Sequence, residues 1–228
     1  LINSSSVIGS AANLIIKNVA SIKNTLDEAT LQGRNVVISD VNNITNAGLI
    51  FANDELALNN IQTLNNTSKI SAEDTVSTDS VNNINNSGTV SSGSSVTISN
   101  SGKFINTGEI TSGNVKIDNI NTLDNQNSIA AESDLEFKQV NKLTNNGLLY
   151  SANTLTIQNI IDLINSSDST SGSEAQIIAD AGMVIKNITN LINAGDTAVV
   201  NSFGLLNIVD VANIANSKRA IISGDMGL

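Results

Sequence analysis

Asparagine is the residue whose type and spacing in this sequence most clearly point to chemistry, because its carboxamide both donates and accepts hydrogen bonds. It recurs at intervals of about 20 residues along the chain. Such a series is either a polar column that binds a ligand or a structural ladder of stacked amides that also turns a corner in the left-handed backbone region. We favour the ladder, since a ligand site rarely needs eleven identical copies. The series consists of Asn3, Asn24, Asn46, Asn66, Asn86, Asn106, Asn125, Asn145, Asn165, Asn193 and Asn216.

Oxygen ligands for a metal ion occur at Asp168, Glu174 and Asp180. Hard ligands of this kind suit calcium, but their spacing matches neither an EF-hand loop nor the glycine-rich nonapeptide calcium repeat. The chain contains no His and no Cys, which removes the usual ligands of zinc and copper. We therefore predict no metal site and no cofactor.

Groups that could catalyse a reaction are also sparse. The lack of His and Cys removes imidazole bases and thiol nucleophiles, and the 21 acidic residues do not recur beside a cluster of Lys or Arg. Enzymes such as polysaccharide lyases that use a β-helix gather their charged groups in one cleft. We predict no catalytic residues, no small-molecule substrate and no enzymatic activity.

Aromatic rings are few, but two of them occupy the same place in the repeat described below. Phe51 and Tyr150 each lie at its eleventh position, next to an inward-facing one, so we expect both rings to face solvent. Exposed rings can stack on sugars. Two isolated rings about five repeats apart are more often ordinary surface residues, and the sequence alone does not select a ligand.

The composition excludes several classes of partner. The formal net charge is −10, and Arg34 and Arg219 are the only arginines, so the chain lacks the basic surface that a phosphate backbone requires. No apolar run approaches the roughly 20 residues that cross a bilayer, and we expect a soluble segment. Apolar residues make up 40% of the chain and aromatic residues 2%, which favours thin layers of small aliphatic side chains.

The sequence repeats itself with a period of about 20 residues. Clear copies are VNNITNAGLIFANDELALNN from Val41, VNNINNSGTVSSGSSVTISN from Val81 and VNKLTNNGLLYSANTLTIQN from Val140. Apolar residues alternate within each copy, which indicates about three short strands, and Asn, Gly or Asp separate them as turn signals. Strands that recur with this period pair with the same strand one turn later, in parallel.

Two positions of the repeat are apolar in all eleven copies and predict the core. The residues at the fourth position are Leu1, Ile22, Ile44, Leu64, Ile84, Phe104, Leu123, Leu143, Leu163, Leu191 and Ile214. The residues at the sixteenth position are Leu14, Val36, Leu56, Val76, Val96, Val115, Leu135, Leu155, Met183, Leu206 and Met226.

These observations predict an all-β fold, a right-handed parallel β-helix (solenoid) of eleven coils with about 20 residues each. We expect residues 1–228 to form a single β-helical segment. The first copy begins at its fourth position and the last stops at its eighteenth. Because solenoids usually have capping repeats at their ends, we expect the segment to be truncated at both ends from a larger protein.

Three insertions interrupt the repeat, and insertions in repeat proteins form loops where function is often placed. The longest replaces three residues between Asn165 and Ile177, and shorter ones lie near Thr25 to Thr30 and Ala194 to Val199. Two of them follow a ladder asparagine. The acidic stretch Ser166 to Gln176 is open to three interpretations: a recognition loop, a guard of the strand edge, or tolerated drift.

The motif N-x-G-x-I-x-A/S-x-x-x-L-x-I-x-N, as in NAGLIFANDELALNN from Asn46, resembles the filamentous haemagglutinin repeat of two-partner-secreted bacterial exoproteins. The resemblance spans the whole chain and implies a long β-helical shaft, secreted or displayed at the bacterial cell surface. It also implies an outer-membrane two-partner secretion transporter, which would recognise a domain not present here. Proteins of this family are adhesins, or stalks of contact-dependent inhibition proteins that carry a C-terminal toxin to neighbouring bacteria.

Four functions are to be compared for a chain with this sequence. An adhesive shaft, which we favour, would hold a tip or bind a host-cell or bacterial surface receptor or glycan. A toxin-delivery stalk would be accompanied by a toxin domain and an immunity gene downstream. An enzyme would need a cleft of clustered charges, and an ice-binding surface would need a regular outward file of Thr, which the sequence does not contain.

Overall fold

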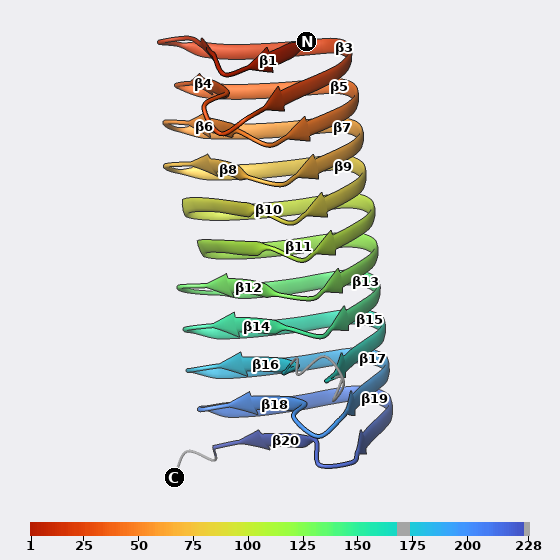
Figure 1. Ribbon diagram of the computed structural model, residues 1–228. Coiled ribbons are helices and arrows are strands. Elements are labelled where there is room, and N and C mark those ends of the chain that lie inside the picture. Colours follow the sequence, from red (N-terminus) through yellow and green to blue (C-terminus); the bar gives the residue numbers. More distant parts are fainter. Residues whose placement is uncertain (168–173, 226–228) are drawn as a thin grey trace. The chain divides into compact units, whose positions relative to one another are not determined.

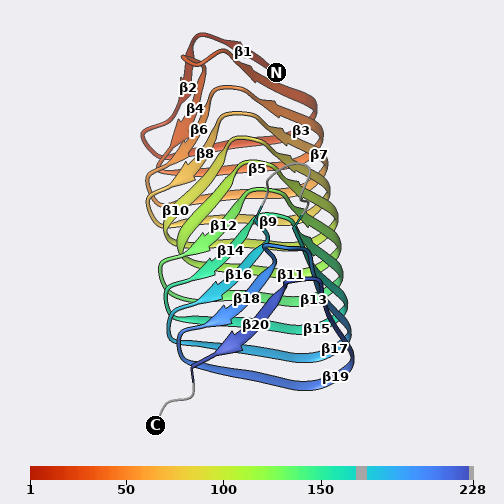
Figure 2. The same cartoon turned by 60° about the horizontal axis from the view of Figure 1, so that its bottom comes forward.

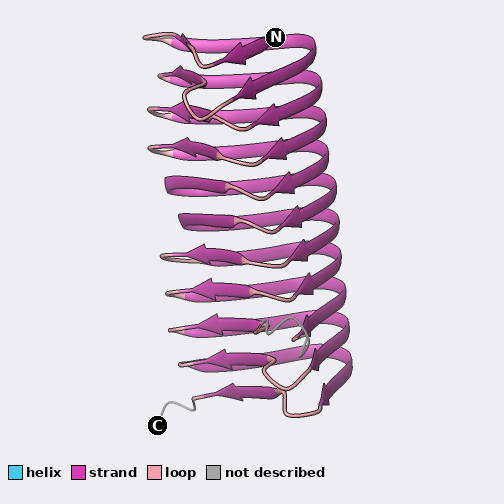
Figure 3. Cartoon of the chain, viewed as in Figure 1, coloured by secondary structure: helices cyan, strands magenta, loops and turns pink. Residues whose placement is uncertain are grey.

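The computed structural model describes residues 1–167 and 174–225, and every regular element within them is a β-strand (Figure 3). The expected all-β parallel solenoid, with about eleven coils of about 20 residues, is confirmed; its right-handed sense stays a prediction. The chain divides into two compact units, Leu1–Gly113 and Asn114–Leu228. Asp168 and Met226 lie outside the described residues.

The strands of the first unit are β1 (Ile2–Ser4), β2 (Val7–Gly9), β3 (Asn13–Thr25), β4 (Thr30–Gly33), β5 (Asn35–Asn46), β6 (Leu49–Ala52), β7 (Glu55–Asn66), β8 (Lys69–Ala72), β9 (Thr75–Asn86) and β10 (Thr89–Asn106). From β2 to β9 the first unit alternates short and long strands, and each pairs in parallel with its counterpart one coil later (Figure 1). In β10 the two kinds of segment are continuous, so its start pairs with β8 and its remainder with β9. The next strand, β11 (Glu109–Asn125), begins in this unit and ends in the second.

The second unit is built in the same way. Figure 2 shows its short strands in one row and its long strands in another. Its strands after β11 are β12 (Ser128–Ala131), β13 (Leu135–Asn145), β14 (Leu148–Ser151), β15 (Thr154–Ser166), β16 (Gln176–Ala179), β17 (Gly182–Ala194), β18 (Val199–Ser202), β19 (Leu205–Ser217) and β20 (Ile221–Gly224).

The core consists of columns of aliphatic side chains, because parallel in-register pairing places the same repeat position above itself in each coil. Ile44 pairs with Leu64, and Leu64 with Ile84, and all three are at most 4% exposed. The predicted fourth and sixteenth positions pair in this way within each unit. Leu1 and Ile214 are 40% and 53% exposed, since each lies in a terminal coil with a neighbouring coil on one side.

Each long strand contains one residue in the left-handed backbone region, where it bends, and every full coil has three straight segments as the repeat predicts. The residues at this bend have φ angles of 51° to 57° and close each copy of the repeat; they are Asn18, Asp40, Asn60, Ser80, Asn100, Asn119, Gln139, Asn159, Asn187 and Asp210. The expectation that the ladder asparagines adopt this conformation is wrong, since none of them has a positive φ. Their role is carried by the side chain instead.

Candidate functional site

The ladder asparagines form axial hydrogen bonds from coil to coil in each unit. In the first unit Asn3 donates to Asn24, and the series continues through Asn46, Asn66 and Asn86 to Asn106, with Nδ2 to Oδ1 distances of 2.7 to 2.8 Å. In the second unit the corresponding series from Asn125 to Asn216 has distances of 2.8 to 2.9 Å. The predicted ladder is therefore confirmed.

Each ladder amide also satisfies backbone carbonyl groups at the corner of its coil. The Nδ2 atom of Asn66 lies 3.1 Å from the carbonyl oxygen of Ser68 in its own coil and 3.2 Å from that of Thr89 in the next. The asparagines from Asn3 to Asn193 are at most 2% exposed. A ligand cannot reach amides that are buried and bonded in this way, so the ladder is structural.

The insertions all follow a ladder asparagine and so leave each coil at the same corner of the repeat. Strand pairing reveals two shorter insertions in addition, one after Asn216 and one after Asn3. In all of these coils except the first, a buried alanine marks the return to the regular path where other coils have Gly, Ser or Asn: Ala29, Ala175, Ala198 and Ala220. This recurring alanine was the signal that could have revealed the insertion after Asn216 from the sequence.

Two neighbouring insertions in the second unit are joined by Ser167. Its backbone N–H donates to the carbonyl of Ala194 at 3.0 Å, and its Oγ accepts a hydrogen bond from the N–H of Thr197 at 3.1 Å. Gly195 has a φ of 116°, and a Cβ at this residue would lie 2.1 Å from the Oγ of Ser167. The described start of the Ser166 to Gln176 insertion is thus packed against the next coil.

Of the acidic residues considered for calcium, the two that the structure describes have other partners. The carboxylate of Glu174 accepts a hydrogen bond from Gln176, and that of Asp180 accepts one from the Tyr150 hydroxyl. Within residues 1–167 and 174–225, no three acidic side chains gather in a way that could hold a metal ion.

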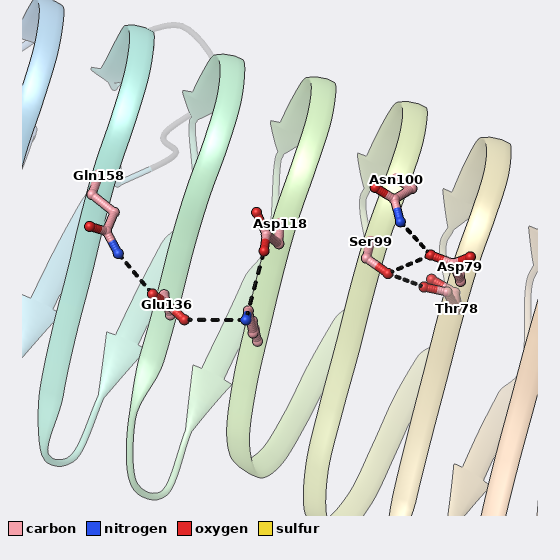
Figure 4. Close-up of polar contacts among 8 residues, drawn as sticks. Thr78, Asp79, Ser99, Asn100, Asp118, Glu136 and Gln158 are labelled. Atoms are coloured by element: carbon pink, nitrogen blue, oxygen red, sulfur yellow. Dashed lines mark hydrogen bonds and ion pairs between the residues drawn. The ribbon is translucent and has the colours of Figure 1, made fainter.

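In the first unit, Asp79 lies on the outer face of the sheet among hydrogen-bond donors (Figure 4). The Nδ2 of Asn100 lies 2.6 Å and the Oγ of Ser99 2.9 Å from its Oδ1. These hydrogen bonds stabilise the carboxylate and hold the pKa of Asp79 below its ordinary value, and the bond from Asn100 has the largest effect. Asp40 resembles it, because a hydrogen bond from Asn60 lowers its pKa.

In the second unit, a small charged group lies on the outer faces of β11, β13 and β15 (Figure 4). The Nζ of Lys116 is 3.7 Å from Asp118 and 3.9 Å from Glu136, whose carboxylate also accepts a hydrogen bond from Gln158. The Lys116 side chain is 46% exposed. Ion pairs this exposed are typical of a solvated sheet face.

The two aromatic residues singled out in the sequence lie in different surroundings. Tyr150 is held by its hydrogen bond to Asp180, which raises the pKa of its hydroxyl. Phe51 is half-buried and lines an open hollow of about 530 Å³ on the first unit, together with residues of β2 and β4. The expectation that both rings lie on the outer face is met, although neither is fully exposed.

Among the described residues, no helix has the length and apolar character needed to cross a membrane. Comparison of the chain with protein-family models, with curated proteins and with solved structures found no match.

Proposed function

We propose that this chain is part of the structural and adhesive shaft of a large secreted bacterial surface fibre of the filamentous haemagglutinin type. The observation that carries the proposal is the buried asparagine ladder, which recurs once per coil within a repeat that resembles that family. Each coil repeats the same axial hydrogen bonds and the same apolar core positions, so further coils can extend the solenoid with the same contacts. This is the construction that a long spacer needs.

The proposal places the protein outside the cell or on the bacterial surface, exported by an outer-membrane two-partner secretion transporter. It assigns no catalytic activity to the chain and no nucleic-acid partner, in keeping with its net charge of −10. The binding partner would be a host-cell or bacterial surface receptor or glycan. Weak contacts repeated along a shaft can add up through multivalency.

The test uses the intact gene in its natural host. A strain that lacks the gene should lose adhesion to its target cells, and restoration of the gene should recover it. Deletion of residues 41–80, which removes two whole repeats and rejoins equivalent positions, should preserve secretion and surface display. Deletion of residues 41–70 joins mismatched positions and should leave a protease-sensitive protein.

A different result of the same experiment would indicate the alternative function, a toxin-delivery stalk. If loss of the gene leaves adhesion unchanged but abolishes the inhibition of neighbouring bacteria, the chain belongs to a toxin-delivery stalk. The sequence of the open reading frame and of its downstream neighbour gives the same answer independently, because a toxin-like C-terminal domain followed by a small immunity gene marks that class.

A further inference from the structure

The hollow beside Phe51 is a candidate binding site on the outer face of the short strands of the first unit. Gly9 of β2 pairs with Gln32 of β4, and Gln32 pairs with Phe51 of β6, so the three residues form one outward file. Val7, Ser10, Ala11, Gly33 and Asn53 complete the lining. The volume of about 530 Å³ is within the range of small-molecule sites.

Two features of the first two coils account for the hollow: Gly9 lacks a side chain, and the corner that follows it is uneven. Gly9 has no side chain to cover the face of the sheet above Gln32, and a Cβ there would lie 3.0 Å from the Cγ of Gln32. Gly9 pairs with Gln32, and Leu14 pairs with Val36. Leu14 nevertheless lies five residues after Gly9, whereas Val36 lies four residues after Gln32. The corners of the first two coils therefore do not stack evenly, and the hollow opens between them.

The lining has the chemistry that recognises an uncharged sugar. Phe51 offers a half-buried ring, on which the C–H face of a pyranose can stack. The carboxamides of Gln32 and Asn53 have no hydrogen-bond partner among the described residues, so both can bond to hydroxyl groups. None of the eight lining residues is charged. The nearby Arg34 and Asp54 neutralise each other in an ion pair of 2.7 Å.

We propose that this hollow binds a neutral oligosaccharide, with Phe51 as the stacking platform and Gln32 and Asn53 as hydrogen-bonding groups. The proposal rests on the adhesive function proposed above and names the class of ligand. A sulfated or sialylated glycan fits less well, because the lining offers no cationic side chain to pair with its charge.

The experiment measures binding of neutral tetrasaccharides of glucose, galactose and N-acetylglucosamine to the purified chain by saturation-transfer NMR. Each is tested at about 10 mM, which nearly saturates a site with a Kd of about 1 mM. We expect at least one to bind and Phe51→Ala to weaken it about tenfold. Gln32→Ala, at an exposed residue, should weaken it severalfold without disturbing the fold.

The control is Phe203→Ala, which removes a ring that is 59% exposed in the second unit, and it should leave binding unchanged. The proposal is overturned if no neutral tetrasaccharide binds, if only sulfated oligosaccharides bind, or if both variants in the hollow bind as the wild type does. The oligosaccharide proposal and the adhesive-shaft proposal can fail independently. The strain that lacks the gene tests adhesion, whether or not this hollow binds a sugar.

Discussion

The Nδ2 atom of Asn46 donates a hydrogen bond to the Oδ1 atom of Asn66 at 2.8 Å, and neither side chain is more than 1% exposed. Asn66 in turn donates to Asn86 at 2.7 Å. Each buried amide is therefore an acceptor for the coil before it and a donor to the coil after it. Removal of one member disturbs two neighbours at once, and bonds in such a chain strengthen one another.

Asn66→Ala should be strongly destabilising. It leaves the amide of Asn46 without its ladder acceptor and the Ser68 and Thr89 carbonyls without a side-chain donor. A buried polar group that loses its partner costs about 1–3 kcal/mol, so we expect a loss of about 3 kcal/mol or more in the free energy of unfolding. Urea unfolding followed by circular dichroism measures it.

The control for this variant is the adjacent Asn65→Ala. Asn65 is half-buried on the outer face, where its Oδ1 accepts an exposed hydrogen bond from Asn85. Substitutions at such sites usually change stability by about 0.5 kcal/mol or less. An equal loss of unfolding free energy in Asn65→Ala and Asn66→Ala would show that a ladder asparagine stabilises the fold no more than a surface asparagine does.

The strand period, the parallel pairing and the ladder could be predicted from the sequence, because all three follow from the residue types that recur at fixed positions. The ladder amide of Asn66 and the core position of Leu64 are examples, since each is specified by its own coil and repeated in the next. Because the same residue types recur at the same positions in successive coils, the structural role of each position can be recognised from a single sequence.

The details of single coils could not be predicted in the same way. The hollow beside Phe51 depends on an uneven corner between Gly9 and Gln32, and the insertion after Asn216 depends on a register that only strand pairing defines. The assignment of the left-handed bend to the ladder asparagines failed because Asn occurs at both positions, for example Asn60 and Asn66, and composition does not distinguish a backbone role from a side-chain role.

The left-handed bend gives a second prediction, at Gln139. This exposed residue has a φ of 54°, a conformation that costs a residue with a side chain about 1–2 kcal/mol and costs Gly little. Gln139→Gly should therefore raise the free energy of unfolding by about 0.5–1 kcal/mol after the greater entropy of Gly in the unfolded chain is subtracted. Gln139→Val should lower it, because a β-branched residue fits this region poorly.

The matched control is Gln62→Gly, at an exposed strand residue whose φ is not positive. Gly there should lower stability by about 0.5–1 kcal/mol. If glycine has the same sign of effect at Gln62 and Gln139, backbone strain at the bend does not govern these substitutions.

Successive coils approach each other closely at Gly108. A Cβ at this residue would lie 2.0 Å from the carbonyl oxygen of Gly88, and the 2.8 Å hydrogen bond from Glu109 N to that oxygen would have to lengthen. Ser68, at the equivalent place, illustrates the strain, since the bond from Lys69 N to the Gly48 carbonyl is 3.3 Å.

Gly108→Ala should therefore destabilise the chain by about 1–3 kcal/mol, the usual cost of overpacking. Gly182→Ala is the control, because the nearest atom to a Cβ there is 3.7 Å away. Thermal unfolding of both variants measures the difference. Tolerance of Gly108→Ala at the level of Gly182→Ala would mean that neighbouring coils separate freely at this corner.

Tyr150 is the only tyrosine of the chain, which has no tryptophan, so its ionisation can be followed on its own. Its hydroxyl donates to the Oδ2 of Asp180, and this bond, followed by desolvation and the negative charge of Asp180, raises its pKa above the ordinary value of 10.0. The protonated phenol is the bonded form. The contact therefore stabilises the fold below the ordinary pKa, and that contribution disappears as the pH rises through the raised pKa.

Ultraviolet absorbance of the tyrosinate ion follows this single group as the pH is raised. The wild type should titrate at a higher pH than Asp180→Ala, in which the pKa returns toward its ordinary value because both the acceptor and the charge are gone. Asp162→Ala removes a carboxylate that accepts a hydrogen bond from Asn190 instead, so it should leave the titration where it is. If the wild type and Asp180→Ala titrate at the same pH, the bond between Tyr150 and Asp180 does not persist in solution.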